Sequence, residues 1–148
     1  MLILEDVQAT LNVGRELGGL LRVGDKIALR GTLGAGKTTL ARGILEGLGY
    51  RGEVPSPTFA IVQPYEPPET RIPVAHVDLY RIEGPEEIPE LGLDDTLIDG
   101  AMIVEWPGRM PDSFWKDALK IELEITGGGN RWLTWNAGNA WKDRWTLT

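Results

Sequence analysis

Apolar and polar positions in the first third of the chain recur in patterns that predict a helix, a strand and a second helix. Residues 5–22 carry apolar side chains at helical spacing, and Gly18 and Gly19 weaken the end of that helix. Residues 26–30 form a short apolar run that is typical of a buried strand. Residues 38–48 return to the helical period, so a glycine-rich segment joins a strand directly to a helix.

Short apolar runs separated by turn residues continue through the middle of the chain. We expect strands at residues 59–62, 72–79 and 101–106, because each run is apolar and bounded by turn-forming residues. The segment that contains Pro64 is expected to be an exposed loop, since prolines cluster there. Residues 85–97 are acidic and begin with a proline, as a helix often does.

The last part of the chain has the alternation of a hairpin. Residues 119–125 alternate as a half-exposed strand does, and residues 131–135 can pair with them across the glycine turn at residues 127–129. Strands that alternate with helices and end in a hairpin predict one α/β domain over residues 1–148. We expect a mainly parallel central sheet with antiparallel strands at its edges.

Tryptophans are concentrated near the end of the chain. The sequence has six, which is more than packing alone requires in 148 residues. We expect Trp132 in the core, whereas Trp141 and Trp145 fit either the core or a surface that faces a partner.

The composition is that of an ordinary globular protein with an acidic balance. A formal net charge of -7 makes contact with a polyphosphate backbone unfavourable, so we expect no autonomous nucleic-acid binding. The absence of cysteine excludes disulfides, thiolate zinc sites and cysteine nucleophiles. The amino terminus lacks a secretory signal pattern and no apolar stretch approaches a membrane span, so we expect a cytoplasmic protein without membrane contact.

Residues 31–38 match the phosphate-binding pattern G-x-x-x-x-G-K-[ST], which extends the expected fold to a P-loop NTPase-like domain of three layers. Glycines let backbone N–H groups turn inward around phosphate oxygens, and a helix N-terminus adds partial positive charge. The guanine signatures Asn-Lys-x-Asp and Asp-x-x-Gly are absent, so ATP with Mg²⁺ is the expected ligand. The predicted cofactor-binding residues of this loop are Gly34, Ala35, Gly36, Lys37, Thr38 and Thr39.

Two carboxylates follow apolar runs, where α/β sheets bind their ligands. Asp78 and Glu105 are the favoured catalytic pair, one to hold Mg²⁺ and one to orient the attacking water, and residue patterns alone do not assign the two tasks. The Thr58 hydroxyl is a candidate sensor of the γ-phosphate, although local evidence alone favours a proline-stiffened turn in which the threonine is hydrogen-bonded. His76, the one histidine, is expected to be packed or hydrogen-bonded rather than catalytic.

Four motifs occur in the order typical of one family of bacterial ATPases. They are residues 34–39, 56–59, 76–81 and 104–106, and together they resemble the TsaE (YjeE) family, which serves in making threonylcarbamoyladenosine beside the anticodon of certain tRNAs. The resemblance extends to about Arg109. It implies an ATPase that acts with the TsaD and TsaB proteins and meets tRNA only indirectly, through these partners.

The resemblance also implies roles for particular residues. Lys37 and Thr39 contact phosphates, Thr38 and Glu105 ligate Mg²⁺, and Asp78 is required for hydrolysis. The remaining residues carried over are Thr58 and Trp106, which shape the site, and, by position alone, Thr10 and Arg131, which flank the adenine.

Two other classes of protein stay open at this point. A small-molecule kinase of the shikimate type shares the glycine loop, although its usual arginine-rich lid is not evident; Arg81 and Arg109 are the arginines available for one. A regulatory module that binds nucleotide without hydrolysing it is the other alternative.

Overall fold

The structure is a computed structural model that describes residues 1–32, 34–57 and 61–145. The strands are β1 (Leu2–Leu4), β2 (Lys26–Gly31), β3 (Val62–Tyr65), β4 (Val74–Asp78), β5 (Ala101–Glu105), β6 (Leu119–Ile125) and β7 (Arg131–Ala137). The helices are α1 (Val7–Leu20), α2 (Lys37–Gly47) and α3 (Leu93–Asp99), with 3₁₀ turns at Pro85–Glu87, Pro89–Leu91, Pro107–Arg109 and Asp112–Trp115.

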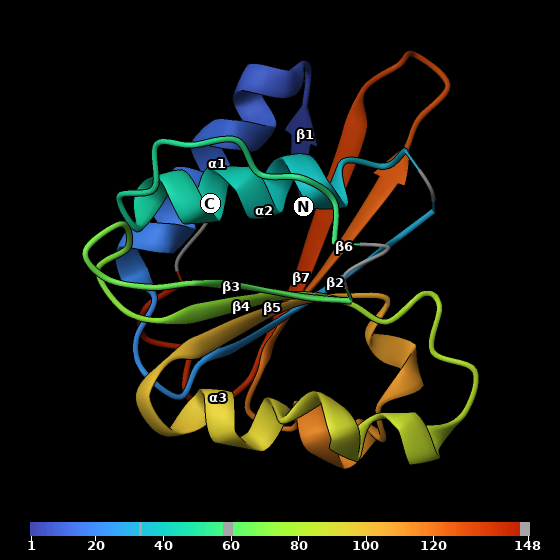
Figure 1. The fold of residues 1–148 in the computed structure, drawn as a ribbon. Helices are drawn as coiled ribbons and strands as arrows, with labels where there is room; N and C mark the ends of the chain where they lie inside the picture. Colours follow the sequence, from blue (N-terminus) through green and yellow to red (C-terminus); the bar gives the residue numbers. More distant parts are fainter. Residues whose placement is uncertain (33, 58–60, 146–148) are drawn as a thin grey trace.

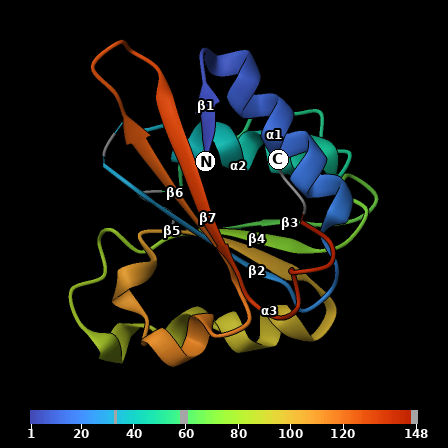
Figure 2. The ribbon, with the colours of Figure 1, turned by 180° about the vertical axis from the view of Figure 1, so that it is seen from behind.

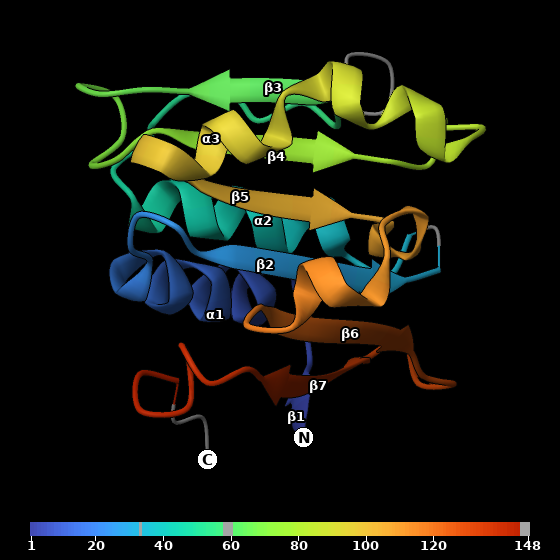
Figure 3. The same cartoon turned by 90° about the horizontal axis from the view of Figure 1, so that it is seen from below.

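The strands form one sheet in the order β1-β7-β6-β2-β5-β4-β3 (Figure 3). The four central strands β6, β2, β5 and β4 run parallel, while β7, β1 and β3 are added antiparallel at the two edges. Helices α1 and α2 cover one face of the sheet, and α3 with the 3₁₀ turns covers the other (Figures 1 and 2). The predicted three-layer α/β class is therefore confirmed.

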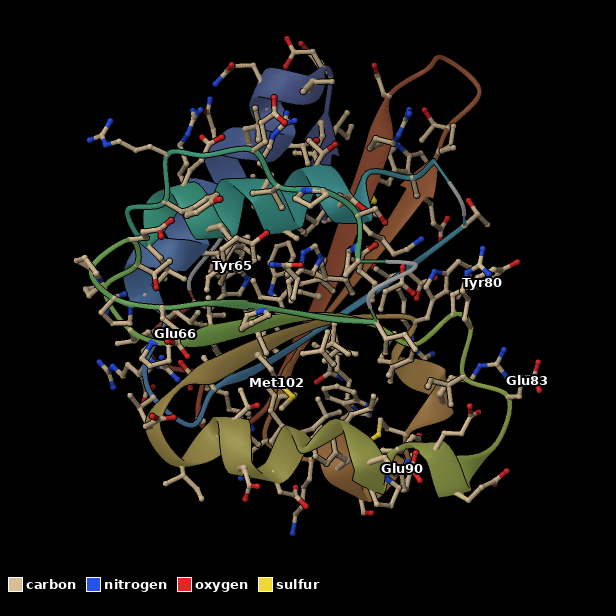
Figure 4. The ribbon with its side chains drawn as sticks, viewed as in Figure 1. Tyr65, Glu66, Tyr80, Glu83, Glu90 and Met102 are labelled. Atoms are coloured by element: carbon tan, nitrogen blue, oxygen red, sulfur yellow. The ribbon has the colours of Figure 1, made fainter. Side chains whose placement is uncertain are left out.

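The two faces of the sheet bury separate apolar clusters. Leu29 and Ile103 pack under α1 and α2, whereas Ala28 and Val104 face α3 and the 3₁₀ turns, as the alternation of a strand requires. Figure 4 shows the same division, with Tyr65 on the side of α2 and Met102 pointing toward α3. Among the residues that the structure describes, none of the helices combines the length and the apolar character that crossing a bilayer requires.

The edge strands differ from expectation. The strand predicted at residues 59–62 is wrong in its bounds, because β3 occupies Val62–Tyr65 and includes Pro64; residues 59 and 60 lie outside the described chain. Pro64 pairs with Ala75 of β4, and an edge strand tolerates proline because one side of it makes no ladder hydrogen bonds. The acidic segment 85–97 forms two 3₁₀ turns before the α-helix begins at Leu93.

The positions of the tryptophans near the end of the chain also differ in part from expectation. Trp132 is 42% exposed, so its expected place in the core is wrong: strand alternation buries Leu133 instead and turns Trp132 to the other face of β7. Figure 3 shows β7 at the side of the sheet, away from α3. Trp141 and Trp145 are buried in the cluster beneath α1 and α2. The Arg144 guanidinium connects this segment to the residue before β2, because it donates two 2.7 Å hydrogen bonds to the Asp25 carboxylate.

Helices α1 and α2 touch backbone to backbone through four glycines, Gly14 and Gly18 of α1 and Gly43 and Gly47 of α2. A Cβ atom at Gly18 would lie 2.2 Å from the Ile44 carbonyl oxygen, and one at Gly47 would lie 2.3 Å from the Arg15 carbonyl oxygen. Gly18 therefore does more than weaken the end of α1, because any side chain there would force the two helices apart.

A pair of substitutions tests this contact. We expect Gly18→Ala to lower the free energy of unfolding by about 1–3 kcal/mol, the usual cost of overpacking. Gly19→Ala is the matched control, since a Cβ there meets no atom within 4 Å and alanine raises helix stability by up to about 1 kcal/mol. Urea unfolding followed by circular dichroism measures both, and equal stability of the two variants would contradict the proposed contact.

Candidate functional site

The glycine-rich loop lies between the end of β2 at Gly31 and the start of α2 at Lys37. Gly34 and Gly36 have φ angles of 80° and 107°, in the left-handed region that residues with side chains rarely adopt. The Ala35 side chain is buried, and its N–H donates to the Thr32 carbonyl oxygen at 3.1 Å. The loop thus presents the N-terminus of an 11-residue helix, where partial positive charge favours an anion.

Lys37 is buried at the mouth of this loop. Its Nζ donates to the carbonyl oxygens of Gly31 at 2.6 Å and Thr32 at 2.9 Å, and lies 4.4 Å from the centre of the Trp106 ring. Burial lowers the pKa of Lys37 below its ordinary value, and the nearby charges of Glu105 and Asp78 oppose that shift. The ammonium group is therefore held in place by neutral partners beside two carboxylates.

The two predicted carboxylates lie next to each other across β4 and β5. Asp78 and Glu105 are paired in register, each only 3% exposed. Asp78 Oδ1 accepts a hydrogen bond from the backbone N–H of Tyr80 at 2.8 Å. Glu105 accepts from the Thr38 hydroxyl at 3.2 and 3.3 Å, so the predicted pair of Mg²⁺ ligands is already in contact.

A cleft of about 270 Å³ opens between the loop and the ends of the strands. Its walls include two residues that sequence reasoning had not singled out, Tyr80 and Ser56. The signal for them was available, because both belong to the motifs at residues 76–81 and 56–59. The cleft is lined by Gly34, Gly36, Lys37, Thr38, Thr39, Ser56, Asp78, Tyr80, Glu105 and Trp106.

A second hollow, of about 200 Å³, adjoins this cleft on the other side of the loop. Thr10 of α1 and Arg131 of β7 both line it, together with Gly34, Gly36 and Thr39, which also line the first cleft. The Arg131 guanidinium donates to the Gly34 carbonyl oxygen at 3.2 Å. Residues predicted to flank a nucleobase are thus brought together beside the predicted phosphate loop.

Trp106 follows β5 with a φ angle of 61°, a left-handed conformation that is strained for a residue with a large side chain. Its ring contacts both Lys37 Nζ and the ring of Tyr80, whose centroid is 4.9 Å away. Figure 4 shows Tyr80 in the segment that follows β4, at the carboxyl end of the strands. Thr58, the candidate γ-phosphate sensor, lies outside the described residues.

The oxygen atoms of Thr38 and Glu105 suit Mg²⁺, which prefers hard oxygen ligands and usually keeps waters or phosphate oxygens in its remaining positions. Within the described ranges no group of three or more His, Asp or Glu side chains is close enough to hold a metal alone. Thr38 and Glu105 supply two such oxygens, so water or other oxygen ligands would fill the remaining positions of a cation held there.

A roomier hollow of about 420 Å³ lies elsewhere, between β2, β6 and β7 and the 3₁₀ turn Asp112–Trp115. None of the predicted site residues lines it. We choose the smaller cleft as the candidate site in spite of its lower volume, because it combines a helix N-terminus, a buried lysine and two buried carboxylates.

Comparison with known proteins identifies relatives along most of the chain. The sequence profile described as "Threonylcarbamoyl adenosine biosynthesis protein TsaE" matches residues 4–132. The proteins named "tRNA threonylcarbamoyladenosine biosynthesis protein TsaE" in Streptomyces coelicolor and Bacillus subtilis are 41% and 34% identical to this chain. The alignments cover 82% and 91% of this chain, and 93% and 84% of the two relatives.

A solved structure supports the same assignment. The crystal structure of Bacillus subtilis YdiB matches with a TM-score of 0.77 and 27% sequence identity, over 96% of this chain and 87% of that one. The family profile spans more than half of the chain, and the sequence relatives align over nearly their full lengths. The chain therefore belongs to the TsaE family of tRNA threonylcarbamoyladenosine biosynthesis proteins.

Proposed function

We propose that this chain binds ATP with Mg²⁺ and hydrolyses it in support of threonylcarbamoyl transfer to tRNA. The observation that carries the proposal is the contact between the Thr38 hydroxyl and the Glu105 carboxylate, 3.2 Å apart at the N-terminus of α2. The buried Lys37 and Asp78 line the same cleft. A helix N-terminus, a lysine, a hydroxyl and two strand-end carboxylates are the parts that P-loop enzymes use on a triphosphate.

The residues of the loop would bind the phosphates. Lys37 Nζ exchanges the carbonyl oxygens of Gly31 and Thr32 for charged phosphate oxygens, which form shorter and stronger hydrogen bonds. Thr38 and Glu105 would hold Mg²⁺, which supplies positive charge to the β- and γ-phosphate oxygens. Thr39 lines both the cleft and the adjoining hollow, so it contacts the phosphates from the side of the nucleoside.

Asp78 is assigned to the attacking water. Glu105 accepts from Thr38, with which it would hold Mg²⁺, and Asp78 lies beside it with Oδ1 accepting from the backbone N–H of Tyr80. A carboxylate fixed in this way can orient a water toward the γ-phosphorus. In-line attack then transfers the phosphoryl group to water and releases ADP.

The hollow beside Thr10 and Arg131 is the proposed adenine site. A planar guanidinium such as that of Arg131 stacks readily on an aromatic base. Thr10 and Gly34 bound the same hollow, which lies next to the proposed phosphate site. A nucleoside can therefore extend from the loop into this hollow without crossing the strand-end carboxylates.

The proposed partners are the TsaD and TsaB proteins, with TsaD carrying out the transfer to tRNA. An acidic chain of net charge -7 meets tRNA unfavourably, so contact through partners is the expected arrangement. A small-molecule kinase is the alternative. Residues 83–92 contain four glutamates and no arginine, so Arg81 and Arg109 remain the arginines available for a phosphate-binding lid.

Lys37→Ala tests the phosphate site. We expect ATP affinity to fall about 10- to 100-fold, because hydrogen bonds to charged groups contribute about 1.5–3 kcal/mol. Isothermal titration calorimetry measures the affinity, and circular dichroism checks the fold. Lys120→Ala, in which an exposed lysine of β6 is replaced, is the control and should bind ATP normally. Unchanged binding by Lys37→Ala would contradict the assignment.

Asp78→Asn separates hydrolysis from binding. Asparagine retains the oxygen that accepts from Tyr80 but loses the charge, so we expect normal ATP affinity and turnover lowered about 10²–10⁴-fold. The assay is ADP release in the presence of TsaD, TsaB and substrate tRNA, with threonylcarbamoyladenosine formation measured in parallel. Asp99→Asn, on the exposed end of α3, should behave like the parent. A parent protein that binds ATP without releasing ADP would instead support the regulatory-module reading.

A further inference from the structure

His76 lies in the middle of β4 and is completely buried. Its Nε2 is 2.6 Å from Glu105 Oε2, the shortest contact made by that carboxylate among the described residues. A carboxylate only accepts, so Nε2 carries the hydrogen and donates it. The expectation that His76 is hydrogen-bonded is therefore confirmed, and its partner is a residue of the candidate site.

The histidine and the threonine hold the carboxylate in different ways. Thr38 shares its hydroxyl between the two oxygens of Glu105 at 3.2 and 3.3 Å, which is long for an O–H donor. His76 engages Oε2 alone, with a short and well-defined bond. A glutamate side chain has three rotatable bonds, and the contact of Oε2 with the imidazole selects one orientation of the carboxylate.

Packing alone does not explain a histidine at this position. Its partners in register are Ile103 on β5, which is apolar, and Gln63 on the edge strand β3. The other ring nitrogen, Nδ1, is buried without a hydrogen-bond partner among the described residues. An aliphatic side chain would fill the space without that cost, so the contact with Glu105 is the feature that only histidine supplies here.

We propose that His76 is a positioning residue that orients Glu105 for the divalent cation and thereby sets the affinity of the site for it. The proposal rests on the proposed function, because Glu105 is a cation ligand only if the cleft binds a metal–nucleotide complex. His76 does not touch the substrate; it acts through Glu105. Residues that orient a metal ligand in this way typically change metal affinity 10- to 100-fold when replaced.

Two substitutions separate positioning from packing. His76→Gln keeps an N–H donor at a similar reach, whereas His76→Leu fills the space without a donor. The probe is Mn²⁺ titrated into the protein with saturating ATP and followed by electron paramagnetic resonance. We expect Mn²⁺ affinity to fall about 10- to 100-fold in His76→Leu and to recover to within about threefold of the parent in His76→Gln.

ATP binding in excess EDTA is the control within the same set of proteins, and it should be equal in all three. Equal Mn²⁺ affinity in the parent and His76→Leu would overturn the positioning role while leaving the proposed function intact. A Mn²⁺ affinity of His76→Gln as low as that of His76→Leu would have the same meaning. A parent that fails to bind Mn²⁺ in the presence of ATP would overturn both proposals.

A second test replaces Glu105, the proposed metal ligand, and leaves His76 in place. It therefore does not depend on how well the His76 variants fold. His76 is the one histidine in the sequence, so its imidazole gives a single set of NMR signals. We expect a downfield, slowly exchanging Nε2–H proton in the parent that persists when Mg²⁺ and ATP are added, and that moves upfield in Glu105→Gln. A signal that is unchanged by Glu105→Gln, or that is lost on adding Mg²⁺ and ATP, would overturn the proposal.

Discussion

The parallel register of β4, β5 and β2 is the constraint on which the candidate site depends. It sets Asp78 beside Glu105 and Glu105 beside Leu29, two residues before the loop begins at Gly31. Parallel strands end at the same edge of a sheet, so one register brings both carboxylates to the mouth of the loop. A slip of one residue would turn either carboxylate to the opposite face, toward α3.

The second constraint is the position of α2, which carries Thr38 and Lys37. Because α1 and α2 meet through Gly14, Gly18 and Gly43, their backbones approach more closely than side chains would allow. This contact and the buried cluster below it fix α2 against the sheet, and with it the distance from the Thr38 hydroxyl to Glu105. The precision of the site thus comes from helix packing as well as from strand pairing.

The sequence predicted the central elements because their signals are local: apolar runs for the inner strands, helical spacing for α1 and α2, and the glycine motif between them. The strands near the edges of the sheet, β3 and β7, could not be predicted as well, because their structure depends on which other elements pack against them. Pro64 indicates a loop unless an edge position is available for it, and the alternating residues of β7 do not reveal which face α1 covers, so Trp132 was assigned to the wrong side. The role of Gly18 was likewise hidden, because it depends on a helix that lies far along the chain.

The residue types of the site could be predicted, but their partners could not. Glu105 is 29 residues from His76 and 67 from Thr38, and no local pattern encodes such contacts. Lys37 donates to loop carbonyls and Glu105 accepts from Thr38 and His76, so the proposed metal–triphosphate would replace the Lys37 and Thr38 contacts with its own. His76 is outside that proposed exchange, and for that reason it would hold Glu105 in one orientation both before and after binding of the proposed nucleotide.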